Sequence, residues 1–406
     1  MRVVMLAGNP LLYDGRVLRH AGALGDAGHE VILLGVIGPN DDAVPLPEFH
    51  RIGGGRVRAY RLDRRRTGLL PRATWLLSAA RRHLAGRLVA LLGPQAPLAE
   101  LMVAPCAVEL ALLGAWFQPD LYHANDLDTL VPAAWAAQLQ RRPYIYDAHE
   151  LYPEESPLLG PGERQARRQV EQKLAGAAQA VITVNDLLAD ELARRYSVAR
   201  PVVVRNVPSL AALPPRPVAA PDAALRLLLH GSWVGLEQPG VDAALQAVAQ
   251  LPLVRLTLRG GVRSPSALQR RLVELGISDR VTLKPRLPGA DALVQAAIVE
   301  QHDVGLSVHL PDCLSRRLAT SSKVFEYLMA GLVVVAADQE GSRHILDESC
   351  AEFFRPGDPT DLARVLATLA ADRSRVRQAQ QMARRRAEQE FNWEQERERL
   401  LSLYPR

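Results

Sequence analysis

The chain has 406 residues, of which 48% are apolar and 23% charged. This composition is typical of a soluble globular protein, and the length exceeds one ordinary hydrophobic core, so the sequence predicts two domains. The formal net charge of +5 allows an anionic membrane surface as a partner without requiring one, and we expect no nucleic-acid partner.

Three cysteines, Cys106, Cys313 and Cys350, lie far apart and form no CxxC pair. Their odd number and spacing predict a reducing compartment and no structural zinc. The first residues enter a strand without the layout of a signal peptide, so we expect a cytoplasmic location, with peripheral attachment to the inner membrane face as an option. The most apolar stretch, residues 99–117, contains two glutamates and a proline and is predicted to be a core helix rather than a membrane span.

Strands and helices alternate along both halves of the chain, which predicts parallel βαβ units. In the first half, strands are expected at residues 2–7, 30–36, 121–124, 144–147, 181–184 and 202–205, and helices at 15–27 and 130–140. In the second half, strands are expected at residues 225–230, 254–259, 281–283, 304–308 and 332–336, and helices at 241–250, 360–372 and 376–403. Between the halves, residues 208–224 hold five prolines and no periodic pattern, so they are expected to form a linker.

The predicted architecture is α/β, with two Rossmann-like, doubly wound domains at residues 1–207 and 225–385 and a cleft between them. In open parallel sheets, ligands bind beyond the carboxyl ends of the strands. This rule selects five candidate loops without any motif, at residues 8–15, 125–129, 148–155, 231–240 and 310–322.

The segment SSKVFEYLMAGLVVVAAD, residues 321–338, predicts a helix that runs into a buried strand. Gly331 suits a left-handed helix end, and one of the two leading serines can cap the helix start. Helical spacing places Glu326 on the same face as Lys323, away from the apolar residues. Glu326 therefore either points into a ligand site or forms an exposed pair with Lys323, and spacing alone leaves both alternatives open.

The densest polar cluster is YIYDAHELYPEE, residues 144–155, which begins with a predicted strand. At a strand's carboxyl end, His149 could donate a hydrogen bond or act as an acid or base. The alternative is a turn with solvated carboxylates, and we favour function because so many polar groups converge there. The acidic members of the cluster are Asp147, Glu150, Glu154 and Glu155.

A second polar stretch, YHANDLD, ends the neighbouring predicted strand. Its side chains could line the same pocket as His149 or cap the next helix, and capping is the favoured role for Asp126 or Asp128.

The loop HGSWVGLEQPG, residues 230–240, joins a predicted strand to a predicted helix. Its glycines let backbone amides approach an anion at the positive end of the helix. The loop is not a G-x-G-x-x-G fingerprint, and the sequence contains neither a P-loop nor a metal-binding spacing, so we expect no metal.

A basic tract at residues 51–87 has eleven arginines against a single acid, Asp63, with Trp75 and several leucines between them. This pattern suits an amphipathic surface that meets anionic lipid, and a solvated helix face is the alternative.

Together these segments resemble GT-B-fold glycosyltransferases of the large retaining family that includes bacterial capsule, lipopolysaccharide and phosphatidylinositol-mannoside enzymes. The resemblance covers nearly the whole chain. YDGRVLRHAGALGDAGHEV is similar to the family's first helix and second strand, and DLYHANDLDTL and YIYDAHELYPE are similar to its cleft motifs. SSKVFEYLMAGLVVVAAD is similar to the donor-site helix and is the most specific match. FNWEQERERLLSLY is similar to the terminal helix, which implies that residues 386–406 cross back to the first domain.

The resemblance implies sugar transfer, with retention, from a nucleotide diphosphate sugar to a sugar, lipid-linked or small-molecule acceptor, in polysaccharide, glycolipid or secondary-metabolite biosynthesis. It implies no metal, because helix ends and side chains stabilise the leaving group. Glu326 would accept hydrogen bonds from the donor's ribose hydroxyls, and His149 would lie near the transferred sugar. The expected donor-binding residues are Gly231, Ser232, Arg317, Ser322, Lys323 and Glu326. The expected acceptor-side residues are Arg16, His123, Asp126 and Glu150.

Three departures from the family pattern bear on activity. Leu318 stands where the family often has a second glutamate, and the loop at residues 231–240 lacks the usual arginine and lysine. In the first loop, NPLLYDGR replaces the usual pair of glycines, which makes Arg16 a candidate phosphate or acceptor contact. Candidates for the missing positive charge are Arg259, Arg263, Arg316, Arg317 and Lys323. Two alternatives therefore stay open, a catalytically silent relative that serves as a binding subunit and a sugar-nucleotide epimerase.

Overall fold

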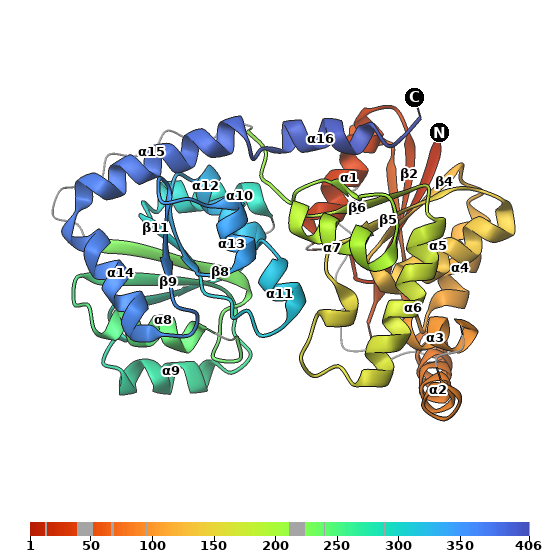
Figure 1. The fold of residues 1–406 in the computed structure, drawn as a ribbon, viewed down its shortest axis with the longest axis horizontal. Helices are drawn as coiled ribbons and strands as arrows, with labels where there is room; N and C mark the ends of the chain where they lie inside the picture. The colour runs from red at the N-terminus through yellow and green to blue at the C-terminus, as the bar shows by residue number, and fades with distance from the viewer. Residues whose placement is uncertain are drawn as a thin grey trace. The chain divides into compact units, whose positions relative to one another are not determined.

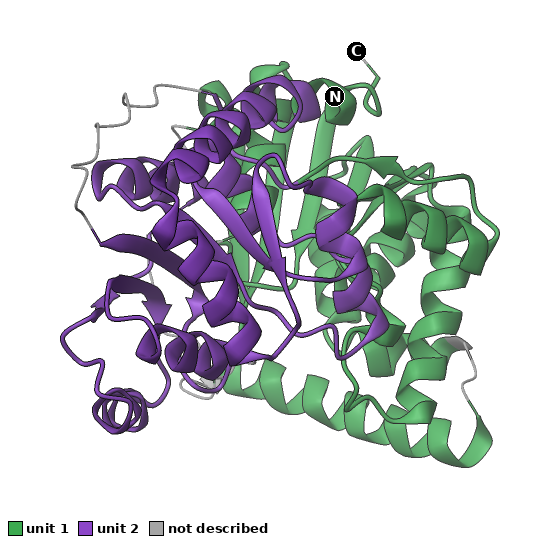
Figure 2. Cartoon of the chain, turned by 60° about the vertical axis from the view of Figure 1, so that its left-hand side comes forward, with its two compact units in different colours: residues 1–205, 397–406 green, residues 206–396 purple. Residues whose placement is uncertain are grey.

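The computed structural model describes residues 1–12, 14–38, 52–65, 69–93, 96–210, 224–238, 240–287 and 289–405. The chain forms two compact units (Figure 2). Unit 1 comprises Met1–Arg205 and Arg397–Arg406, and unit 2 comprises Asn206–Glu396. Most of the predicted linker at residues 208–224 lies outside the described residues, which stop at Leu210 and resume at Ala224.

Unit 1 is built on a seven-stranded parallel sheet with the strand order β3-β2-β1-β4-β5-β6-β7. Its strands are β1 (Arg2–Ala7), β2 (Glu30–Ile37), β3 (Val57–Asp63), β4 (Leu121–Asn125), β5 (Tyr144–Ala148), β6 (Ala180–Thr183) and β7 (Val202–Val203). Its helices are α1 (Gly15–Asp26), α2 (Leu69–Leu92), α3 (Ala96–Val103), α4 (Ala107–Trp116), α5 (Leu127–Gln140), α6 (Pro161–Ala177) and α7 (Asp186–Tyr196). The central strands are apolar and buried on both faces, as a parallel sheet covered by helices requires.

The strand order of unit 1 reverses at β1, which pairs with β2 on one side and β4 on the other. Right-handed crossovers therefore place α1 and α5 on opposite faces of the sheet (Figure 1). The carboxyl ends of β1 and β4 diverge at this switch point, which is where ligands of open α/β sheets bind. Asp126 and the residues that follow β5 lie at this edge.

Unit 2 has a six-stranded parallel sheet with the order β10-β9-β8-β11-β12-β13, so its switch point lies between β8 and β11. Its strands are β8 (Leu225–Trp233), β9 (Val254–Gly261), β10 (Val281–Lys284), β11 (Val304–Ser307), β12 (Val333–Ala337) and β13 (Ala351–Phe354). Its helices are α8 (Val241–Ala249), α9 (Pro265–Glu274), α10 (Ala290–Val299), α11 (Leu314–Leu318), α12 (Ser322–Met329), α13 (Glu340–Ile345), α14 (Pro359–Ala371) and α15 (Arg373–Gln389). Helix α16 (Trp393–Leu401) begins in unit 2 and ends in unit 1.

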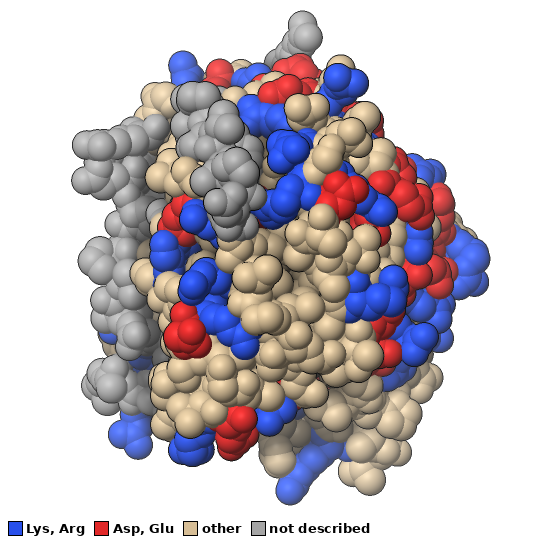
Figure 3. All heavy atoms as spheres, turned by 90° about the vertical axis from the view of Figure 1, so that its left-hand side faces the viewer, with Lys and Arg blue, Asp and Glu red and all other residues tan. Residues whose placement is uncertain are grey.

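The surface of α14 and α15 carries charges of both signs. Arg364 lies 2.8 Å from Asp361, and Arg386 lies 3.1 Å from Glu390. On the face of the molecule drawn in Figure 3, basic and acidic side chains are likewise interspersed. This face therefore has no extended field of a single sign.

The two doubly wound α/β units confirm the predicted fold class, while one strand was not predicted and two predicted helices are each divided in two. The basic tract contains a strand, β3, which covers residues 57–63 and separates its first arginines from those of α2. The apolar stretch at residues 99–117 forms two helices, α3 and α4. The long helix expected at residues 376–403 is also two, because the Asn392 side chain accepts from the Gln395 amide and starts α16 anew.

Within the described ranges, no single helix has the length and apolarity to cross a membrane. Pro97–Val103 and Ala107–Trp116 pass that test only as a pair, by length and composition, with a bend of 87° between them.

Candidate functional site

The buried centre of the unit 1 site is Asp147, near the end of β5. Its side chain is inaccessible to solvent, and Arg16 from α1 donates from Nε to Oδ2 (2.9 Å) and from Nη2 to Oδ1 (2.7 Å). A further N–H of Arg16 donates to the Val204 carbonyl at 2.6 Å. Arg16 is only 4% exposed, so its expected role as a phosphate or acceptor contact is corrected to that of the cation that neutralises Asp147.

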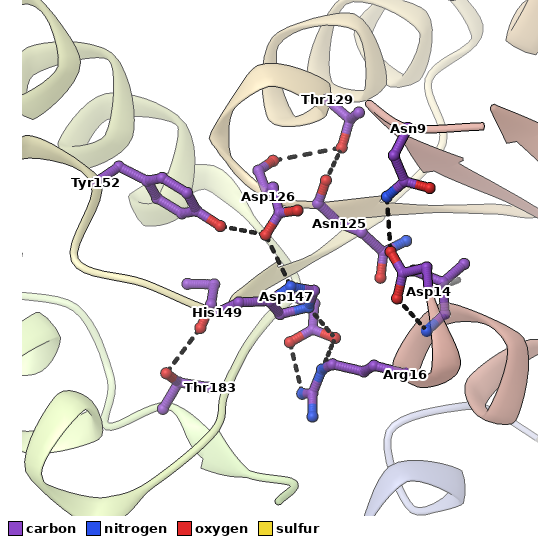
Figure 4. A network of polar contacts seen from close by, with 12 residues as sticks. Asn9, Asp14, Arg16, Asn125, Asp126, Thr129, Asp147, His149, Tyr152 and Thr183 are labelled. Carbon is purple, nitrogen blue, oxygen red and sulfur yellow. Dashed lines mark hydrogen bonds and ion pairs between the residues drawn. The ribbon is translucent and has the colours of Figure 1, made fainter. Parts of the chain in front are cut away.

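His149 lies between two carboxylates (Figure 4). Its Nδ1 is 2.8 Å from Asp126 Oδ1, and its Nε2 is 3.2 Å from Asp147 Oδ2. The Tyr152 hydroxyl donates to the same oxygen of Asp126. We call Arg16, Asp126, Asp147 and His149 the Asp147 network.

The protonation of this network follows from its partners. Burial by itself would lower the pKa of His149, but the charges of Asp126 and Asp147 and the hydrogen bonds to them raise it to about 10. Burial would raise the pKa of Asp147, but Arg16 and then His149 hold it well below its usual range. Both ring nitrogens thus face carboxylate oxygens, an arrangement that favours the doubly protonated ring.

Asp126 stands at the first position before α5, where capping was the favoured prediction. Its side chain makes no cap hydrogen bond to the helix, and its carboxylate is used by His149 and Tyr152 instead. Of the two capping candidates, Asp126 is therefore ruled out, because two polar partners outside the helix take its oxygens, whereas the Asp128 carboxyl has backbone hydrogen bonds at residues 128 and 129.

His123 on β4 is completely buried behind Asp147. Its Nδ1 contacts the hydroxyl of Tyr404, and its Nε2 lies 3.8 Å from Asp147 Oδ2. His20 approaches the same oxygen at 3.5 Å, so His20, His123 and Asp147 together have the residue types of a metal site. Since Arg16 occupies both oxygens of Asp147, a metal cation would be repelled there, and we read the group as a polar core cluster.

The rest of the predicted polar cluster separates from His149. Glu154 forms ion pairs with Arg164, Arg168 and Arg195, and Glu155 pairs with Arg167 at 2.6 Å. These pairs hold the turn Tyr152–Glu154 against α6 and α7. Glu150 is exposed. Glu154 and Glu155 therefore belong to a turn, as the alternative interpretation expected, but their carboxylates form ion pairs and are not simply solvated. Asp147 and His149 belong to the Asp147 network instead.

Unit 2 has its own pocket, of about 170 Å³, at the switch point between β8 and β11. We call it the Gly231 pocket. It is lined by Leu229, His230, Gly231, Ser232, Trp233, Gln238, Val241, Leu306, Val308, His309 and Lys323. Of the predicted donor-binding residues, it thus brings together Gly231, Ser232 and Lys323.

Glycines shape the walls of the Gly231 pocket. A side chain at Gly231 would begin 3.3 Å from Cε of Lys323, so the absence of one lets the lysine lie along the backbone. Gly240 has φ +93°, and a Cβ there would lie 1.9 Å from the Val308 carbonyl oxygen. Only glycine therefore allows the loop to close on β11 and to begin α8 beside the pocket.

Glu326 lies on α12 next to this pocket and is not part of an exposed pair. Its side chain is 12% exposed, and its Oε2 is 2.9 Å from Nε2 of His230. Burial lowers the pKa of His230, although Glu326 opposes this effect. Burial also lowers the pKa of Lys323, and the charge of Glu326 opposes this effect too. The sequence showed His230 beside Gly231, but no pattern linked it to Glu326, which is 96 positions further on.

The predicted arginines have partners of their own in unit 2. Arg317 pairs with Glu340 at 3.0 Å and lines a different pocket with Asp338 and Arg343. The remaining three candidates also have partners: Arg316 pairs with Asp312, Arg259 with Glu300, and Arg263 stacks over Trp233. Ser322 opens α12 but is absent from the lining of the Gly231 pocket as described. Among the candidate cations, Lys323 lines the Gly231 pocket as described, and Arg263 lies over the pocket residue Trp233.

Comparison with known proteins assigns both halves of the chain to glycosyltransferase domains. Residues 15–208 match the family model of the glycosyl transferase 4-like domain, and residues 242–402 match that of glycosyl transferase-like domains. A D-inositol 3-phosphate glycosyltransferase of Streptomyces bingchenggensis is 26% identical over 322 residues, which are 71% of this chain and 68% of that protein.

Solved structures agree on the fold. Sucrose-phosphate synthase from Thermosynechococcus elongatus superposes with a TM-score of 0.70 at 19% identity, over 100% of this chain and 98% of that one. Anabaena HepE in complex with UDP and glucose superposes with a TM-score of 0.68 at 18% identity, over 99% and 98% of the two chains. At this identity the likeness concerns the fold alone, and it confirms GT-B. With family models matched in both units, the chain belongs to the large family of GT-B-fold glycosyltransferases.

Proposed function

We propose that this protein transfers a sugar from a nucleoside diphosphate sugar to an acceptor, with retention of configuration and without a metal ion. The observation that carries the proposal is the Gly231 pocket, which combines a glycine loop, the start of α8, Lys323 and the neighbouring Glu326 in one unit. Anabaena HepE, whose fold this chain shares, was solved with UDP and glucose, which makes UDP the first nucleotide to try.

Each group has a distinct task in this proposal. The amides at Gly231 and Ser232, the positive end of α8 and the Lys323 ammonium would bind the diphosphate and stabilise the charge that develops on it as the sugar leaves. Glu326, oriented by His230, would accept hydrogen bonds from the ribose hydroxyls. His149 would serve the transfer step from unit 1.

Glu326→Ala is expected to weaken UDP binding by about 1–3 kcal/mol, or roughly 5- to 150-fold, because hydroxyl partners of the nucleotide lose a charged acceptor. Calorimetric titration of UDP into the wild type and the variant measures this loss. The matched control is Glu340→Ala, which removes an exposed glutamate that pairs with Arg317 outside the Gly231 pocket. Equal UDP affinities for the wild type and Glu326→Ala would take Glu326 out of the site.

A donor screen separates the proposal from its two alternatives. Incubation with nucleotide sugars and candidate acceptors should give a glycosylated acceptor and free nucleoside diphosphate. A changed sugar with free nucleotide and no acceptor product would identify an epimerase. Failure to bind any nucleotide would leave a silent binding subunit.

For the acceptor, we propose a lipid-linked or membrane-proximal molecule reached from an anionic, cytoplasmic membrane surface. Helix α2 carries the observation: it contains no acidic residue, and Arg72 and Arg87 are exposed on it. Leu70, Leu77, Leu84 and Leu91 recur every seven residues and are 59–80% exposed, so they form one apolar ridge. Trp75 is only partly exposed, so these leucines replace it as the inserting residues.

The protein is expected to float with anionic vesicles at low salt and to remain in solution at high salt or with neutral vesicles, because salt screens the arginines within about 8–10 Å. Leu77→Glu on α2 should weaken flotation, whereas Leu158→Glu, at a leucine that is 92% exposed outside α2, should not. If the wild type stays in solution with anionic vesicles at low salt, a small soluble acceptor replaces the membrane proposal.

A further inference from the structure

We propose that Asp126 is a positioning residue that clamps His149 against Asp147 as a permanent cation. His149 would then assist transfer through its fixed charge, and no proton would leave or enter the ring during the reaction. The inference rests on the proposed function for the use of His149, and on the contacts of unit 1 for the clamp itself.

The first support is the geometry at the ring. Both nitrogens face carboxylate oxygens, at 2.8 Å for Asp126 and 3.2 Å for Asp147. A neutral imidazole has one N–H donor, so it would leave one of these carboxylates facing a lone pair. Two carboxylates on opposite nitrogens therefore select the doubly protonated ring.

The second support is the backbone of Asp126, which has φ 71° and ψ 164°. This region is costly for any residue other than glycine and persists only where the surroundings enforce it. Here the Asp126 amide donates to the Asp147 carbonyl at 3.0 Å, and Tyr152 holds its carboxylate from the other side. The strained conformation directs the carboxylate at His149 and not at the first turn of α5.

The third support is the charge balance around the ring. Arg16 already neutralises the charge of Asp147. A protonated His149 therefore needs a second carboxylate to balance its charge, and Asp126 supplies it. The other titratable groups that approach Asp147 are His20 from α1 and His123 from β4. Burial and then Arg16 lower the pKa of His20 well below its usual range, so His20 adds no competing charge.

The direction of the pKa of His149, raised to about 10, agrees with this reading. Removing the Asp126 charge should lower that pKa by about 1–3 units, the usual effect of an opposite charge at this distance. Asp126→Asn is the suitable variant, since asparagine has nearly the same shape, meets the same backbone cost as aspartate at this position and carries no charge.

The test is an NMR titration of the protein labelled at histidine, with the His149 signals assigned through His149→Gln. In the wild type, both ring nitrogens should carry protons at pH 8, and the titration midpoint should lie well above the ordinary histidine pKa of about 6.5. In Asp126→Asn the midpoint should fall, and turnover should decline as pH rises through the new midpoint while UDP affinity stays unchanged. Asp190→Asn, the control at an exposed carboxylate of α7 that pairs with Arg200, should leave the midpoint in place.

A neutral His149 ring in the wild type at pH 8, or an unshifted midpoint in Asp126→Asn, would overturn the proposal. The wild-type measurement needs no variant, so it decides the question even if Asp126→Asn does not fold. It also needs no substrate. If the His149 ring is charged but the protein transfers no sugar, the proposed function is contradicted, whereas the proposed role of Asp126 in holding His149 is not.

Discussion

Replacing Asp147 by alanine is expected to destabilise unit 1 by about 3–5 kcal/mol, the usual cost of leaving a buried charge without its partner. The Arg16 guanidinium is 4% exposed and makes two of its hydrogen bonds to Asp147. Without the carboxylate, this guanidinium and the His149 imidazolium would face each other's charge with only Asp126 nearby. Urea unfolding, with hydrogen exchange to resolve unit 1 from unit 2, measures the loss.

The control for this prediction is Asp190→Ala, which breaks an exposed ion pair with Arg200 and should cost at most about 1 kcal/mol. If Asp147→Ala lowers the free energy of unfolding no more than Asp190→Ala does, the buried ion pair stabilises the protein no more than the surface pair.

The pH dependence of stability has a sign that can be worked out for this network. The pKa of Asp147 is depressed in the folded state, so its contribution is present above its unfolded pKa of about 3.9 and is lost as pH falls below it. The pKa of His149 is raised to about 10, so its contribution is complete below about 6.5 and is lost as pH rises from there to about 10. The loss of stability at low pH should be absent from Asp147→Ala, and the loss at high pH should be absent from His149→Gln.

The second large effect is expected for His149→Gln, with turnover reduced by about 10²- to 10³-fold, as for the loss of one preorganised group that stabilises charge in a transition state. Glutamine fills the space and can donate one hydrogen bond, but it carries no charge. Affinity for UDP should stay unchanged, because the Gly231 pocket lies entirely in unit 2. Steady-state rates and UDP titration together separate the two effects.

Unchanged turnover with the true donor and acceptor would remove His149 from the reaction. Weaker UDP binding with unchanged turnover would assign it to nucleotide binding instead. A Gln179→Ala variant, at a residue of unit 1 outside the Asp147 network, controls for unspecific damage to this unit.

The sequence by itself determined most of the secondary structure and the family, because both depend on short-range patterns. The helix predicted at residues 15–27 is preceded by Asp14, a typical capping residue, and its side chain accepts from the Val17 amide. Gly331 was predicted to end α12 and has φ +64°. Candidate loops could be selected because chain order along parallel strands already tells where their carboxyl ends lie. The missed strand β3 and the missed start of α16 had local signals as well, namely the alternation in VRAYRLD and Asn392 before a new helical run.

Only the tertiary structure decided which polar residues serve the site, because their partners are distant in the chain and their protonation depends on burial. Arg16 and Asp147 are 131 positions apart, and no local pattern distinguishes a buried cation from a ligand contact. From the sequence, Asp126 was expected to cap a helix, but in the folded protein its carboxylate contacts His149 and Tyr152 instead. Lys323 differs from Arg317 in the same way: both were candidate cations, but α12 directs Lys323 to Gly231, whereas Glu340 pairs with Arg317. The charge state of a side chain is set by the groups that folding places around it, and spacing along the chain carries no record of them.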